Sequence, residues 1–294
     1  MPARLILNAD DFGLTPGINR AIGELHSAGA LSGGRALTSA TLMANGAAFE
    51  HAVAIAHAHP TLGVGCHIVL TDGIPVSPPE TIPTLLGPDR KSFRPSLTAF
   101  LRALFLGRIR EQDVEREALA QVEKLQRAGI TVTHVDSHKH THLFPAIARP
   151  LLRVAETSGV RAIRNPFEPA WDLRLGHGSR MRRLALRLTE GLHSRFLAHP
   201  QIRSGTVLTT DGTVAISATG ILSAGTLRQI IAALPPNGCF ELCCHPGYND
   251  ADLDRIATRL RAQRNLEREA LLSEVPALLR AANAPKLIHF GDLC

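Results

Sequence analysis

Lysine and aromatic side chains are scarce in this sequence of 294 residues. Only four of the 32 basic residues are Lys, and the aromatic residues are ten Phe, one Trp and one Tyr. Few rings are therefore present that could stack on nucleic-acid bases. The arginines are mostly mixed with Glu and Asp, and only residues 174–195 are locally rich in Arg. We interpret the net charge of +6 as a solvated basic face and expect no nucleic-acid partner.

The sequence also lacks long apolar runs and a disulfide pattern. No run approaches the ~20 apolar residues of a membrane-spanning helix, and the apolar segment at residues 5–7 is too short for a signal-peptide core. The five cysteines are odd in number, and Cys243 and Cys244 are adjacent, so no disulfide framework is indicated. We expect a cytoplasmic protein without a transmembrane segment, in which Cys243 and Cys244 pack within a strand.

Strand-like and helix-like segments alternate along the whole chain. Apolar and β-branched runs predict strands at 4–9, 36–43, 62–71, 132–136, 160–164, 207–209, 238–244 and 286–290. Helical patterns occupy 16–29, 49–58, 97–106, 111–128, 146–158, 180–197, 226–234 and parts of 251–281, the first capped by Thr15 and closed by Gly29. This alternation predicts an α/β fold with a parallel sheet, closed or nearly closed into a (β/α) barrel. An open, doubly wound sheet is the alternative.

We predict a single domain over residues 1–294, because no internal repeat, low-complexity segment or linker-like change of composition divides the chain. Two segments interrupt the alternation. Residues 72–95 contain six prolines and no periodicity, which predicts a long Pro-rich loop, and residues 165–204 form a basic insertion with its own helix.

Polar side chains gather where the predicted strands end. In a (β/α) barrel the active site is built from the carboxyl ends of the strands and the loops that follow them. Five strands each bring His, Asp or Arg to this rim, as Asp10, Asp11, His67, Asp136, His138, Arg164 and His245.

Residues 132–142 contain four histidines and an aspartate, which are common ligands of a catalytic divalent metal. Side chains alternate between the two faces of a strand, so at most two or three of them can reach one metal ion. Each feature also has a simpler interpretation: Asp10 and Asp11 before Gly13 could cap a turn, and His67 could be a core histidine.

Four motifs, residues 8–13 (NADDFG), 65–67 (GCH), 133–138 (THVDSH) and 244–246 (CHP), resemble the YdjC-like carbohydrate deacetylases. These are relatives of chitooligosaccharide deacetylases. The resemblance implies a distorted or incomplete (β/α) barrel of about seven parallel strands. In detail the chain is most similar to the branch associated with hopanoid biosynthesis, in which an N-acetylglucosaminyl lipid is deacetylated.

The resemblance implies one divalent metal held by Asp11, His67 and His138, with Asp10 as the catalytic base. The implied reaction removes the acetyl group from an N-acetylated amino sugar, in an oligosaccharide or in a glycolipid such as an N-acetylglucosaminyl hopanoid. Three protein ligands leave positions open for water and for the acetyl oxygen, as in a catalytic metal site.

Three further residues complete the predicted site. Amide hydrolysis requires a proton for the leaving amine, and His245 is our candidate because histidine titrates near neutral pH. Asp136 is expected to orient a ligand histidine, and Arg164 to fix Asp10 or a sugar hydroxyl. An Asp and two His suit Zn²⁺, whereas the family is commonly described with Mg²⁺, so the metal stays open between the two.

Other functions remain open at this point. A metal-dependent phosphoesterase or another amidohydrolase-type hydrolase on a barrel would commonly use a second metal, for which His134, His140 and His142 are candidates. A glycoside hydrolase would need Asp10 and Asp11 to face each other, whereas neighbouring strand residues point apart. A basic binding protein with a metal-storing histidine loop is the non-enzymatic alternative. The oligomeric state is open and includes a homodimer.

Overall fold

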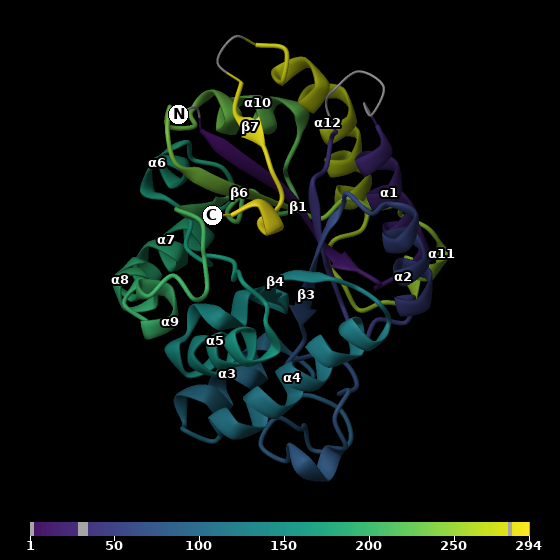
Figure 1. The fold of residues 1–294 in the computed structure, drawn as a ribbon, viewed down its shortest axis with the longest axis vertical. Coiled ribbons are helices and arrows are strands. Elements are labelled where there is room, and N and C mark those ends of the chain that lie inside the picture. Colours follow the sequence, from purple (N-terminus) through teal and green to yellow (C-terminus); the bar gives the residue numbers. More distant parts are fainter. Residues whose placement is uncertain (1–2, 29–34, 282–283, 294) are drawn as a thin grey trace.

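A seven-stranded sheet lies at the centre of the computed structural model, which describes residues 3–28, 35–281 and 284–293 (Figure 1). The strands are β1 (Arg4–Phe12), β2 (Ser39–Leu42), β3 (Gly63–Ile68), β4 (Val132–Ser137), β5 (Gly212–Val214), β6 (Cys239–Cys244) and β7 (Lys286–Leu287). They are parallel and follow the order β4-β3-β2-β1-β6-β5, with β7 beside β1. Their inward and outward residues are nearly all buried, as is typical of a parallel sheet covered by helices.

β1 is a central strand of the sheet and pairs with β2, β6 and β7. β6 pairs with it from Arg4 to Ala9 along one edge. The other edge is divided, since β7 pairs with Arg4 and Leu5 and β2 pairs with Asn8 to Phe12. The first and last strands of the described chain therefore lie side by side.

The sheet curls toward a barrel, but hydrogen bonds between strands do not close it completely. Between β4 and β5 the connection consists of two isolated parallel bridges, Val135 to Ile163 and Ala162 to Leu208. The strands predicted at 160–164 and 207–209 are thus reduced to isolated bridges at Ala162, Ile163 and Leu208. β5 was not predicted. The distorted, incomplete (β/α) barrel is confirmed.

Helices surround the strands on all sides in Figure 1. They are α1 (Pro16–Ser27), α2 (Phe49–Ala58), α3 (Leu97–Phe105), α4 (Glu111–Arg127), α5 (Pro145–Ser158), α6 (Ala170–Arg174), α7 (Arg180–Thr189), α8 (His193–Leu197), α9 (Pro200–Arg203), α10 (Ala224–Ala232), α11 (Ala251–Asp254) and α12 (Ala262–Leu278). Short 3₁₀ turns add η1 (Pro79–Thr81), η2 (His138–Leu143), η3 (Glu190–Leu192) and η4 (Phe290–Asp292). Thr15 caps α1 by accepting from the N–H of Ile18 at 3.2 Å. The predicted end of that helix, Gly29, lies outside the described residues.

Several predicted boundaries were wrong. β1 runs three residues beyond the predicted end and includes Asp10 and Asp11. The helix predicted at 180–197 is divided into α7, η3 and α8, and the last predicted strand keeps only Lys286 and Leu287 before η4. The Pro-rich segment 72–95 contains η1 and an isolated antiparallel bridge between Leu86 and Phe93, and is otherwise irregular.

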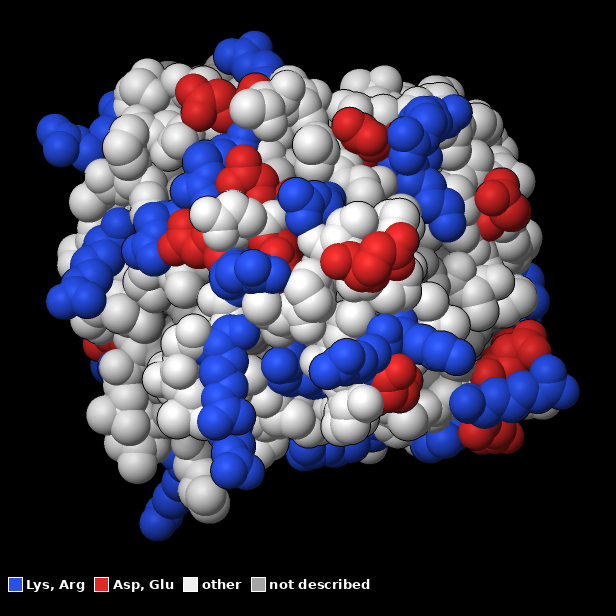
Figure 2. All heavy atoms as spheres, turned by 90° about the horizontal axis from the view of Figure 1, so that it is seen from below, with Lys and Arg blue, Asp and Glu red and all other residues white. Residues whose placement is uncertain are grey.

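Charged side chains of both signs are interspersed on the lower face of the molecule (Figure 2). Ion pairs join α4 to α5, where Arg149 and Arg153 contact Glu111 and Glu115. Exposed pairs of this kind contribute little to stability, but they neutralise the arginines locally.

Gly65 in β3 is required by a close contact with a neighbouring ring. His134 of β4 is buried and stacks on Phe290, with ring centroids 3.8 Å apart. A Cβ atom at position 65 would overlap the His134 ring, which the stack prevents from moving. The glycine of the 65–67 motif and His134 are therefore two halves of one packing contact.

We predict that Gly65→Ala lowers the free energy of unfolding by about 1–3 kcal/mol, the usual cost of overpacking. Urea denaturation would measure it. Gly191→Ala is the control, because no atom lies within 4 Å of the added Cβ, and it should change stability by less than about 0.5 kcal/mol. Equal stability of the two variants would contradict the packing argument.

A second prediction concerns His26, which is buried in α1 between the carbonyl of Leu37 and the hydroxyl of Thr61, each 3.0 Å away. Burial lowers its pKa from 6.5 to about 4. The unfolded chain binds this proton at higher pH than the native state, so stability should fall as the pH drops from about 6.5 to 4, by roughly 3 kcal/mol for this residue. Across this pH range the free energy of unfolding should fall less steeply in His26→Gln than in the natural protein. An equal slope in the two proteins would contradict the lowered pKa of His26.

Candidate active site

The seven site residues predicted from the sequence lie together at the carboxyl ends of the strands. Asp10 and Asp11 come from β1, His67 from β3, Asp136 from β4 and His138 from η2 directly after β4. Arg164 follows the bridged segment, and His245 follows β6. All but His138 and His245 are nearly inaccessible to solvent.

A bulge in β1 lets two consecutive aspartates reach this site. The pairing with β2 shifts register between Ala9 and Phe12, and Asp11 has a φ of +65°. In a regular strand, neighbouring side chains point to opposite faces. The extra residue of a bulge re-aims them, and Asp tolerates the left-handed region better than most residues. Our expectation that Asp10 and Asp11 diverge was therefore too simple.

Asp11, His67 and His138 present three donor atoms to one point. Asp11 Oδ1 lies 3.3 Å from His138 Nδ1 and 3.7 Å from His67 Nε2, and the two ring nitrogens are 3.3 Å apart. Ligands 2.0–2.2 Å from a tetrahedrally coordinated metal are about 3.4 Å from one another. Asp11 Oδ1 is also buried without a hydrogen-bond donor. These residues fit a divalent cation in both spacing and unfilled bonding capacity.

Asp136 fixes the orientation of His67. Its Oδ1 accepts a hydrogen bond from His67 Nδ1 at 2.7 Å, which turns Nε2 toward Asp11. Burial alone would lower the pKa of His67, but the carboxylates of Asp136 and Asp10 outweigh it and raise the pKa to about 9. The surroundings of this ring therefore favour positive charge.

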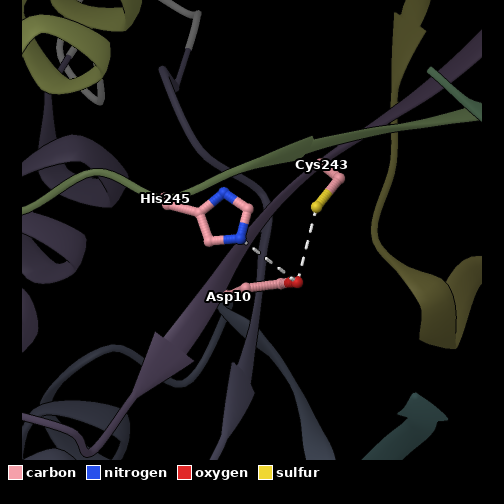
Figure 3. Close-up of side chains that lie close together, drawn as sticks. All are labelled: Asp10, Cys243 and His245. Carbon is pink, nitrogen blue, oxygen red and sulfur yellow. Dashed lines mark hydrogen bonds and ion pairs between the residues drawn. The ribbon is translucent and has the colours of Figure 1, made fainter. Parts of the chain in front are cut away.

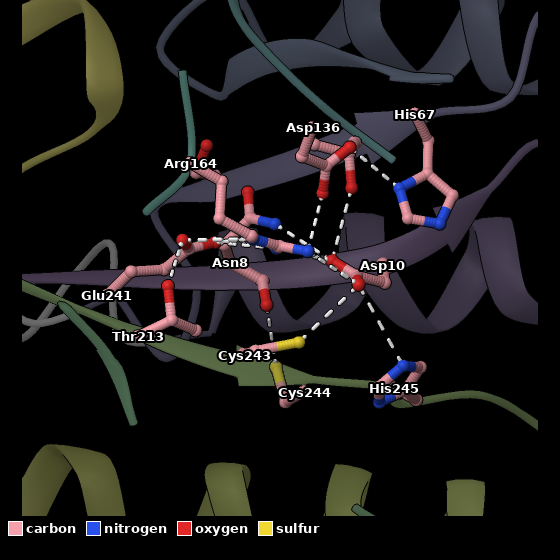
Figure 4. Close-up of polar contacts among 12 residues, drawn as sticks. Asn8, Asp10, His67, Asp136, Arg164, Thr213, Glu241, Cys243, Cys244 and His245 are labelled. Atoms are coloured by element: carbon pink, nitrogen blue, oxygen red, sulfur yellow. Dashed lines mark hydrogen bonds and ion pairs between the residues drawn. The ribbon is translucent and has the colours of Figure 1, made fainter. Parts of the chain in front are cut away.

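Arg164 is a fully buried cation that holds three carboxylates together (Figure 4). Its guanidinium forms a bidentate contact with Asp10 at 2.6 and 2.9 Å, and it approaches Asp136 and Glu241 at 2.6 Å each. Burial alone would raise the pKa of Asp10, but Arg164 holds it well below the usual range of a carboxyl group. Asp10 is therefore ionised at neutral pH.

A second buried arginine was not predicted. Arg264 of α12 donates from Nη2 to Asp11 Oδ2 at 2.5 Å. This contact occupies one oxygen of Asp11 and leaves Oδ1 to face the two histidines. In the sequence, Arg264 is one of many arginines in helical segments, so no local signal distinguishes it.

Cys243 and His245 face Asp10 from β6 and the residues after it (Figure 3). Asp10 Oδ2 accepts from the Cys243 thiol at 3.4 Å and lies 3.8 Å from His245 Nε2. Burial, together with the charge of Asp10, raises the pKa of Cys243 well above its usual value, so the thiol stays protonated and can donate. Reading Cys243 only as a packed strand residue was incomplete, whereas Cys244 does pack in the strand, with its sulfur 3.2 Å from the Asn8 carbonyl.

The remaining histidines of residues 132–142 lie outside the group formed by Asp11, His67 and His138. His134 stacks on Phe290, and His142 Nδ1 bonds the Ser137 hydroxyl at 2.6 Å. Within the described ranges, every group of His, Cys and acidic side chains close enough to share a metal contains Asp10 or Asp11. His134, His140 and His142, our candidates for a second metal, belong to none of these groups.

The sequence matches the family described as YdjC-like protein over residues 4–281. The chain belongs to the YdjC-like family. A Brevibacillus brevis relative named carbohydrate deacetylase is 39% identical over 193 residues, which is 66% of this chain and 69% of the relative. A Geobacillus stearothermophilus relative of the same name is 41% identical over 53% of this chain and 57% of its own length.

The fold of this YdjC-like protein also matches a solved structure over nearly its whole length. That structure is an Enterococcus faecalis V583 protein named for cellobiose-phosphate cleavage. The TM-score is 0.75 at 23% identity, covering 99% of this chain and 98% of the other. At this identity the match establishes the fold. None of the helices in the described ranges has the length and apolar character to cross a membrane.

We predict that Arg164→Ala lowers the free energy of unfolding of this YdjC-like protein by about 3–5 kcal/mol, because it leaves buried carboxylates without their counter-charge. Arg149→Ala is the control, since its pair with Glu111 is largely exposed and should contribute roughly 0–1 kcal/mol. Chemical denaturation of both variants would test this. A loss at position 164 no larger than at position 149 would show that the buried cluster is not held by Arg164.

Proposed function

We propose that this protein is a metal-dependent hydrolase that removes the acetyl group from an N-acetylated amino sugar. The observation that carries the proposal is the convergence of Asp11, His67 and His138 beside Asp10 and His245. Curated relatives named carbohydrate deacetylase support the choice of reaction.

In this proposal Asp11, His67 and His138 hold one divalent metal, with Zn²⁺ and Mg²⁺ as the candidates. When bound, such a metal lowers the pKa of water and polarises a carbonyl group. Asp136 keeps His67 in the tautomer whose Nε2 is a free ligand atom. Arg264 keeps Asp11 turned so that Oδ1 faces the imidazoles.

Asp10 acts as the general base, through Oδ2. Its Oδ1 accepts from Arg164, Asn8 and Thr41. Oδ2 accepts from Arg164 and the weakly donating thiol of Cys243, and it faces His245. Oδ2 therefore has more remaining capacity to take a proton from an attacking water. Arg164 keeps the carboxylate ionised and fixed, at the cost of basicity.

His245 acts as the general acid that protonates the leaving amine. It is partly accessible, unlike Asp10, and therefore lies on the side from which a substrate arrives. Glu267 of α12 accepts from the His245 backbone N–H at 2.6 Å and holds this residue in place. His245 Nε2 is the ring nitrogen that faces Asp10, 3.8 Å from Oδ2.

The substrate we propose is an acetylated amino sugar in an oligosaccharide or in a glycolipid such as an N-acetylglucosaminyl hopanoid. Acetate release from N-acetylglucosamine oligomers and from glycolipids would separate these two classes. A phosphoesterase with two metals is the competing function, and metal analysis giving two ions per chain would favour it.

We predict that Asp10→Asn abolishes acetate release while the metal content stays the same, because the substitution removes the base but no ligand. His67→Ala and His138→Ala should lose both metal and activity, since a site with two ligands binds metal far more weakly. Metal analysis after dialysis and an acetate assay would measure both properties.

His199→Ala is the control, since this residue lies between α8 and α9 and outside all three groups that could hold a metal. It should keep both metal and activity. Unchanged metal content in both His67→Ala and His138→Ala would refute the ligand assignment, and substantial activity in Asp10→Asn would refute the base.

A further inference from the structure

Helix α7 carries its apolar side chains on the face that points to solvent. Met181 is 83% exposed, Leu184 59% and Leu188 77%, and no side chain of α7 is buried. The spacing of three and four residues places these three on one side of the helix. An ordinary surface helix turns such a stripe toward the core, so α7 has the opposite orientation.

The opposite side of α7 is fastened to the protein. Arg182 Nη1 donates to the carbonyls of Ser217 and Thr219 at 3.3 and 2.8 Å, and Arg183 donates to those of Gly176 and Gly178 at 2.6 Å each. Gly178 has a φ of +72° and approaches the Ser217 carbonyl so closely that a Cβ would collide with it. The outward orientation of the apolar stripe is therefore built into the contacts of the helix.

The surroundings of this stripe are strongly basic. Residues 173–203 contain seven arginines and a single acidic residue, Glu190. Arg180 and Arg187 are exposed and lie on one flank of the stripe by helical spacing. By contrast, Arg149 and Arg153 of α5 have acidic partners in α4. An exposed apolar face bordered by arginines is typical of a helix that lies in a membrane interface.

α7 also lies at the rim that holds the active site. The carbonyls bound by Arg182 follow β5, at the carboxyl ends of the strands. In the same loop, Gly220 donates to Glu267, which also holds the backbone of His245. Ile221, in this loop, is 46% exposed and adds to the apolar surface at this rim.

We propose that α7 docks this protein on the surface of an anionic lipid bilayer. Met181, Leu184 and Leu188 enter the boundary between headgroups and acyl chains, and Arg180 and Arg187 contact lipid phosphates. A second copy of the chain fits this face less well, because a two-fold contact through α7 would bring two arginine-rich segments together with Glu190 as their only acidic residue. The proposal does not depend on the reaction that the site catalyses.

Co-sedimentation with phosphatidylcholine vesicles, with and without phosphatidylglycerol, tests it. The natural protein should bind only the vesicles that contain phosphatidylglycerol. The double variant Leu184→Ser/Leu188→Ser should bind these at least about tenfold more weakly, and Arg180→Gln/Arg187→Gln should lose about fivefold for each arginine. Phe105→Ser is the matched control, since Phe105 is 71% exposed on α3, and it should bind like the natural protein.

The α7 variants are expected to keep their melting temperature, because none of the substituted side chains is buried. The proposal is overturned if the natural protein does not bind phosphatidylglycerol vesicles, or if Phe105→Ser weakens binding as much as the α7 variants. It is also overturned if sedimentation equilibrium shows that the natural protein is a dimer and Leu184→Ser/Leu188→Ser is a monomer, while the natural protein does not bind the vesicles. In that case a second copy covers the face.

Discussion

The pairing of one buried guanidinium with three carboxylates is the interaction on which the rest of the site depends. Arg164 joins Asp10 of β1, Asp136 of β4 and Glu241 of β6, so it connects strands on both sides of the incomplete closure. Where backbone pairing between β4 and β5 is reduced to isolated bridges, this side chain supplies contacts across the interior instead. The same contacts keep Asp10 ionised and hold Asp136 against His67. Fold and site are therefore stabilised by the same charges.

The sequence was sufficient to predict which side chains gather at one rim, because parallel strands bring their carboxyl ends together. Each of Asp10, Asp11, His67, Asp136 and His138 stands at the end of an apolar run, and a local pattern identifies such a position. The barrel class followed from the alternation of strands and helices for a similar reason, since hydrophobic periodicity is a local property of the chain.

What could not be predicted depends on tertiary contacts that leave no local pattern. The β1 bulge arises from register against β2, and Arg264 reaches Asp11 from α12, a helix distant in sequence that packs against α1 and α10. The role of Cys243 depends on the direction of Asp10 after the bulge. The segments predicted as strands at 160–164 and 207–209 have local sequences suited to a ladder, but in the structure they pair only through isolated bridges.

The divided edge of β1 affects the order in which parts of the protein fold. Lys286 donates its N–H to the Ala3 carbonyl and Ile288 donates to that of Leu5, so β1 receives its last backbone partners from residues more than 280 positions later in the sequence. Asp10 and Asp11 likewise accept hydrogen bonds from Cys243 and Arg264, which come much later in the sequence. In a nascent chain leaving the ribosome, β1 would stay incompletely paired until residues 286–288 had been translated. Contacts so distant in sequence make folding slow, so the candidate site is among the last parts of this structure to assemble.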